Sequence, residues 1–173
     1  MTDEELWLSC DPGEDTGWAL WRGNKLIDAG TEKLWAFGDS VYTAVFTDPV
    51  EIELIGDELA QKFVGITRIV AEDWRLYPWA LKTGELAWDQ CRTARLIGAL
   101  TMICRMGGIE FTLQGAKIKE RAEAAGAEAL FLSPRKENRH ANDAIRHGVY
   151  FQAIARGVAP VVEQGDDDAF GGF

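Results

Sequence analysis

Two carboxylate residues stand where hydrophobic strands end, positions that strand propensity does not favour for an acid. Asp11 follows the apolar run at 6–10 and precedes the turn Pro12-Gly13, and Glu72 closes the run at 68–72. Because the ends of strands in a mixed sheet can lie side by side, we expect the two carboxylates to meet. Gly13 would leave room for a metal ion or a phosphate to approach. The alternative for Asp11 is turn chemistry alone, and for Glu72 it is a surface acid.

The segment HANDA supplies a third group of polar side chains. His140 and Asp143 are three residues apart in a predicted helix, so they share one face. His147, four residues after Asp143, lies on the same face, but a packing or surface role is favoured for it. Clustered carboxylates repel one another unless they share a cation, and oxygen ligands with one imidazole suit Mg²⁺ or Mn²⁺. We predict that Asp11, Glu72, His140 and Asp143 hold two divalent ions about 4 Å apart, an arrangement that supports phosphodiester cleavage.

The elements that must position these groups follow from the pattern of apolar residues. Strands are expected at 6–10, 17–22, 25–33, 66–74 and 109–114. Helices are expected in the second half of 40–63 and over 85–106, 116–126 and 140–157, with 129–134 short and extended. This order predicts an α/β fold, in which three antiparallel strands and then parallel strands form a mixed sheet with helices on both faces.

Length and composition limit the class of protein. The chain has 173 residues, of which 47% are hydrophobic, enough for one domain with a core. No apolar run is long enough to cross a membrane, the acidic start does not resemble a signal peptide, and Cys10, Cys91 and Cys104 lack metal-ligand spacing. We therefore expect a cytoplasmic protein with reduced thiols.

The net charge of -10 is unevenly distributed along the chain. Residues 1–60 carry 14 acids and 3 bases, whereas residues 61–160 carry 10 acids and 15 bases. The total charge argues against a nucleic-acid partner, but a basic face confined to the later part of the chain would permit one. Residues 161–173 carry 4 acids and no base, and we expect a disordered acidic tail. This tail would solubilise the protein, bind a replication or recombination partner, or compete with DNA for the basic face.

These motifs resemble the RuvC-type Holliday junction resolvases of the RNase H-like nuclease superfamily. The similarity lies in Asp11-Pro12-Gly13 followed by Thr16-Gly17, in Glu72 at the end of a central strand, and in His140 with Asp143-Ala144 in the last helix. The turn before Thr16 is one residue shorter than in the common bacterial form. The glycine-rich segment of the family, with its second lysine, is not recognisable between residues 119 and 139. The compact form looks like a bacteriophage relative, which would act in the host cytoplasm.

The resemblance implies an RNase H-like nuclease domain over residues 1–160. It implies a homodimer whose two sites each nick one strand of a four-way DNA junction during recombination or repair. Asp11, Glu72, His140 and Asp143 would bind Mg²⁺ or Mn²⁺, water would be the nucleophile, and Lys117 would offset the charge of the scissile phosphate.

Two further segments are expected to contact DNA. In the loop after Glu72, Trp74 or Tyr77 could stack on a base, and Arg75 and Lys82 could reach phosphates. The alternative for these rings is a cap on the core or a dimer contact. The second segment lies just before the last helix and carries Arg135, Lys136 and Arg139. We expect these basic side chains to hold DNA; the alternative is a solvated face.

Other functions remain open on the sequence alone. An RNase H-like nuclease could act on flaps or on RNA-containing substrates instead of junctions. The DPGxxTG turn also resembles the phosphate-binding turn of sugar kinases and actin-like ATPases, although those proteins need two such domains. A catalytically inert nucleic-acid-binding module of the same fold is the third alternative.

Overall fold

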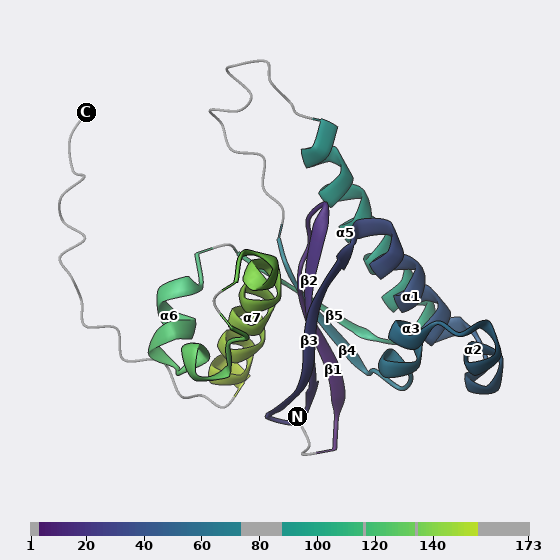
Figure 1. Cartoon of the computed structure of the whole chain (residues 1–173), viewed down its shortest axis with the longest axis horizontal. Coiled ribbons are helices and arrows are strands. Elements are labelled where there is room, and N and C mark those ends of the chain that lie inside the picture. Colours follow the sequence, from purple (N-terminus) through teal and green to yellow (C-terminus); the bar gives the residue numbers. More distant parts are fainter. Residues whose placement is uncertain (1–3, 74–87, 116, 134, 156–173) are drawn as a thin grey trace.

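A five-stranded mixed sheet forms the centre of the protein (Figure 1). The computed structural model describes residues 4–73, 88–115, 117–133 and 135–155. Its strands, in the spatial order β3-β2-β1-β4-β5, are β1 (Leu6–Asp11), β2 (Asp15–Arg22), β3 (Lys25–Lys33), β4 (Arg68–Glu72) and β5 (Glu110–Gln114). Its α-helices are α1 (Leu34–Phe46), α2 (Pro49–Ile55), α3 (Glu58–Phe63), α5 (Trp88–Gly107), α6 (Lys119–Ala124) and α7 (Arg139–Ala155).

Helices cover both faces of the sheet. Helices α6 and α7 lie on one face, and α1, α3 and α5 lie on the other (Figure 1). The first three strands are antiparallel, whereas β4 and β5 are parallel to β1. The predicted α/β class, with a mixed sheet between two helical layers, is confirmed.

The sheet register brings three polar residues to one edge. In the parallel pair β1 and β4, Cys10 lies opposite Ala71, so Asp11 and Glu72 are the next residues on neighbouring strands. In the parallel pair β4 and β5, Glu72 lies opposite Gln114. Because these three strands run in the same direction, their carboxyl ends meet at the same edge. The fold therefore places Asp11, Glu72 and Gln114 in a row.

The turn between β1 and β2 is closed by a buried threonine. The Thr16 hydroxyl donates a hydrogen bond to the Gly13 carbonyl at 2.9 Å, and Thr16 Oγ1 accepts a longer one, at 3.4 Å, from the Gly13 N–H. Strand β2 consequently begins at Asp15, two residues earlier than the sequence pattern predicts. This turn ends β1 at Asp11 and leaves that carboxylate at the rim of the sheet.

Alternating side chains divide the apolar residues into two cores. Leu8 and Cys10 of β1 face α1 and α5, whereas Trp7 packs on the opposite side beneath α7. There it stacks on Trp21, with ring centroids 5.3 Å apart and an interplanar angle of 13°. Gly148 of α7 is required at this point, because a Cβ would lie 2.4 Å from the Trp21 ring. The helix that carries the HANDA motif is thus seated directly on the tryptophan layer.

Two expectations about helices were wrong in detail. The helix expected in the second half of 40–63 is divided into α2 and α3, and α1, which the sequence pattern does not predict, begins directly after β3. Residues 127–130, partly expected to be extended, form a short 3₁₀ helix in which Ala127 is buried. Among the described residues, no helix is both long and apolar enough to cross a membrane.

Candidate active site

Helix α7 brings His140 against Asp11 because glycine at position 17 allows a very close approach. A Cβ at Gly17 would lie 1.8 Å from the His140 carbonyl oxygen, so any other residue would push the start of α7 away from β2. With glycine in place, His140 Nδ1 lies 2.9 Å from Asp11 Oδ2. The Thr16-Gly17 part of the opening motif therefore has a structural role in seating this helix.

Asp11, His140 and Asp143 form one group of possible metal ligands. One ligand atom from each lies within 4.8 Å of the others, and all three side chains are half-buried. The hydrogen bond to Asp11 raises the pKa of His140 above its usual value, although partial burial opposes this. Two carboxylate oxygens and one imidazole nitrogen are a donor set that fits Mg²⁺ or Mn²⁺.

Asp143 is held from its other side by Arg146, one turn along α7. Arg146 Nη1 lies 2.5 Å from Asp143 Oδ1, and Nη2 lies 3.0 Å from Glu123 Oε1 of α6. The guanidinium also lies over the Phe131 ring, 4.5 Å from its centroid. Sequence reasoning missed Arg146, and its spacing of three residues from Asp143 was the available signal.

Glu72, the fourth predicted ligand, is not part of the group of three. Its Oε2 lies 3.0 Å from Nε2 of His147, whose Nδ1 lies 2.9 Å from Gln114 Oε1. Glu72 nevertheless ends the strand next to that of Asp11. His147 is buried, in keeping with the packing role favoured for it, but both of its ring nitrogens also have polar partners.

A basic pocket lies beside Asp143. Arg135, Lys136 and Arg139, which the sequence predicts to contact DNA, line it together with Lys119 and Arg146. Lys117 is exposed between β5 and α6 and does not line this pocket. Four of the predicted DNA-contacting residues lie outside the described part of the chain, as does the tail at 161–173: Trp74, Arg75, Tyr77 and Lys82.

Solved structures of RuvC from Thermus thermophilus share this architecture. The RuvC complex with a Holliday junction substrate has a TM-score of 0.55 at 14% identity, and a second RuvC structure has a TM-score of 0.53 at 15% identity. Each comparison covers 90% of this chain and 98% of the other. The chain has a RuvC-like fold.

At this level of identity the similarity establishes the fold alone. No protein-family model matches the chain, and no curated protein matches it. Any assignment of chemistry to the RuvC-like fold therefore depends on the side chains at the carboxyl ends of β1, β4 and β5 and on the facing side of α7.

Proposed function

We propose that this protein is a metal-dependent endonuclease that nicks four-way or other branched DNA junctions. The observation that carries the proposal is the grouping of Asp11, His140 and Asp143, whose ligand atoms lie within 4.8 Å of one another. Asp11 lies 129 residues before His140 in the sequence, and a RuvC-like fold brings β1 and α7 together at the edge of the sheet. A RuvC of this fold has been solved with a Holliday junction substrate, which supports branched DNA as the substrate class.

The candidate ligands would act as a set. Asp11, His140 and Asp143 would hold one divalent ion, and Glu72 on the neighbouring strand would complete a site for a second. When bound, such ions activate a water and stabilise the leaving oxygen in phosphodiester hydrolysis. The hydrogen bond between Asp11 and His140 would orient both ligands before the metal arrives.

The basic pocket beside Asp143 would bind the DNA backbone. Five cationic side chains line it, against the single carboxylate of Asp143: Lys119, Arg135, Lys136, Arg139 and Arg146. This local excess of positive charge explains how a chain with a net charge of -10 could bind a polyanion. Exposed Lys117 would offset phosphate charge near the site, while base stacking by Trp74 or Tyr77 and phosphate contacts by Arg75 and Lys82 stay predictions.

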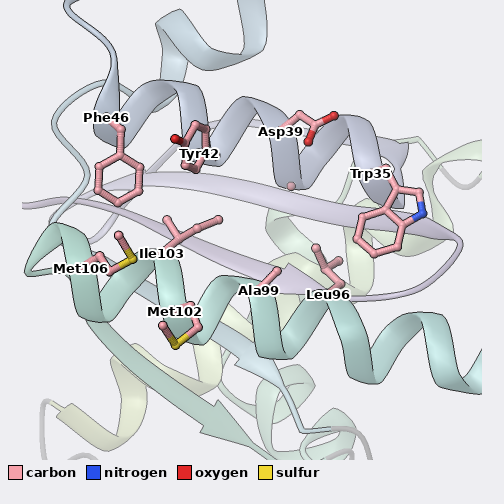
Figure 2. Close-up of a pocket in the computed structure, with 10 residues that line it drawn as sticks. Trp35, Asp39, Tyr42, Phe46, Leu96, Ala99, Met102, Ile103 and Met106 are labelled. Carbon is pink, nitrogen blue, oxygen red and sulfur yellow. The ribbon is translucent and has the colours of Figure 1, made fainter.

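A second copy of the chain would cover the groove between α1 and α5. Figure 2 shows Trp35, Tyr42, Phe46, Met102 and Met106 around this groove. All five of these side chains are exposed, in a cavity of about 340 Å³. The groove lies on the opposite face of the sheet from α7, so a dimer formed here would leave both candidate sites open to DNA (Figure 1).

A nicking assay tests the proposal. The protein is incubated with Mg²⁺ and with a synthetic four-way junction, a flap and an RNA–DNA hybrid of matched length. We expect the junction to be nicked fastest, Asp11→Asn to abolish nicking, and junction binding to survive in that variant. Preferential cleavage of the flap or the hybrid would change the proposed substrate. Nicking by Asp11→Asn at the wild-type rate would overturn the site, and junction binding without nicking by the wild type would favour an inert binding module.

A further inference from the structure

The Glu72 carboxylate is held by a buried pair of side chains that the metal chemistry does not itself require. We propose that His147, supported by Gln114, is a positioning residue that fixes Glu72 beside the candidate metal centre. This inference rests on the proposed function, because it assigns a role within the same site.

The geometry of His147 favours orientation of a neighbour over contact with substrate. Its side chain is only 3% exposed, whereas that of Glu72 is 32% exposed, so the carboxylate reaches the surface and the imidazole does not. A carboxylate oxygen accepts hydrogen bonds and does not donate them, so the hydrogen lies on His147 Nε2. This bond engages Oε2 of Glu72, and Oε1 would then be the oxygen available to a metal ion.

Gln114 fixes the ring from the opposite side. It ends β5 directly across from Glu72, it is buried, and its amide group lies 2.9 Å from His147 Nδ1. With the ring hydrogen on Nε2, Nδ1 accepts, so the Gln114 amide is turned to donate its N–H to this nitrogen. With both nitrogens engaged, the imidazole cannot rotate without breaking a buried hydrogen bond, which costs about 1–3 kcal/mol. The His147 ring therefore fixes the Glu72 carboxylate of β4 relative to Gln114 of β5.

Helix α7 links this arrangement to the group of three. His147 lies four residues after Asp143 and seven after His140, on the same face of the helix. One rigid helix thus carries two candidate ligands and the group that orients the fourth. Partners that orient metal ligands typically change metal affinity or activity by 10–100-fold when they are replaced.

A buried histidine could instead serve only to satisfy its own polar atoms, so the test must separate stability from metal binding. His147→Leu removes both hydrogen bonds and keeps an apolar side chain of similar bulk, whereas His147→Gln keeps an N–H donor toward Glu72. The control is Gln152→Leu, five residues further on α7. Gln152 is also buried, and within the described residues its Nε2 has no hydrogen-bond partner.

Mn²⁺ affinity measured by calorimetry without DNA, and the single-turnover nicking rate, are the two readouts, with circular dichroism to verify folding. We expect His147→Leu to lower both by about 10–100-fold, His147→Gln to recover most of the loss, and Gln152→Leu to match the wild type. A folded His147→Leu protein with wild-type affinity and rate, or His147→Gln no better than His147→Leu, would overturn the inference.

If His147→Leu does not fold, Gln114→Leu takes its place, because it loosens the ring without removing it. Less than a twofold change in Mn²⁺ affinity would then reject the positioning role. Failure of the proposed function has a separate signature, since wild-type protein would then neither bind Mn²⁺ nor nick a junction.

Discussion

Each candidate metal-binding carboxylate has a polar partner on helix α7. Asp11 pairs with His140, Asp143 with Arg146 and Glu72 with His147. Clustered carboxylates would otherwise repel one another in the metal-free protein. The charge of Arg146 and the hydrogen bonds to the two imidazoles offset part of this repulsion, so we expect the site to fold before any metal binds.

This pairing predicts that metal adds stability to a protein that is already folded. At a free Mn²⁺ concentration of about 100 times Kd, binding to the native state contributes about 2.7 kcal/mol, which corresponds to a rise in Tm of roughly 5–10 °C for a chain of this size. Calorimetric melts in EDTA and in Mn²⁺ measure the difference. Asp11→Asn should lose the rise and Asp28→Asn, at an exposed acid paired with Lys62, should keep it. An equal rise in Asp11→Asn would show that Mn²⁺ binds elsewhere.

The three thiols are predicted to differ sharply in reactivity. Burial raises the pKa of the Cys104 thiol to about 12, and burial together with the neighbouring Asp11 raises that of Cys10 well above its usual value. Since the thiolate is the reactive form, both should be nearly inert at about pH 8, whereas Cys91 is only partly buried. A thiol-specific chromogenic reagent should label one thiol quickly in the native protein and all three in guanidinium. Rapid labelling of more than one native thiol would contradict the packing of Cys10 and Cys104.

At the scale of elements, the sequence predicts structure well where local chemistry marks it. Asp48 before Pro49 signals a helix start, and in the structure its carboxylate accepts a hydrogen bond from the Val50 N–H. Helix α1 starts after Lys33 without a side-chain cap, so no local signal marks its beginning. A pair of glycines is typical of a helix end, and α5 does end at Gly107, directly before Gly108.

The candidate site, too, is predictable from the sequence only in part. The order of Asp11, Glu72, His140 and Asp143 and their positions at element ends are visible in the sequence. The contacts of Arg146 with Glu123, and of His147 with Glu72 and Gln114, join residues 23 to 75 positions apart. Such contacts depend on how α7 is seated on the sheet, and hydropathy spacing does not specify that register.

Two glycine substitutions are predicted to have opposite effects on stability, because only one of the two glycines lies against α7. Gly17→Ala places a Cβ 1.8 Å from the His140 carbonyl oxygen, so it should destabilise the protein by about 1–3 kcal/mol and weaken Mn²⁺ binding. Gly98→Ala lies in the exposed part of α5 with nothing near its Cβ, so it should stabilise by about 0.5–1 kcal/mol. Urea unfolding curves measure both. A neutral Gly17→Ala would mean that α7 does not lie this close to β2.

For the whole molecule, the two faces of the sheet present different surfaces. The side of α7 carries the candidate ligands and the basic pocket. The other side carries the apolar groove of α1 and α5, where Met106 is 69% exposed and Tyr42 is 54% exposed. We expect an apolar surface of this kind to be an interaction site, and a two-fold dimer built on it would bury the same patch of both copies.

The groove of α1 and α5 therefore predicts a dimer, and two charged substitutions within the groove should dissociate it. We expect wild-type protein to sediment at twice the 19.2 kDa chain mass, and Tyr42→Glu with Met106→Glu to sediment as a monomer, because buried carboxylates without partners are costly. Leu54→Glu is the matched control, since Leu54 is 82% exposed on α2 and does not line the groove. The monomeric variant should still nick a junction, because the candidate ligands come from one chain, but its two nicks should lose their coordination. A wild-type monomer would refute this interface, and a dimeric double variant would place the contact elsewhere.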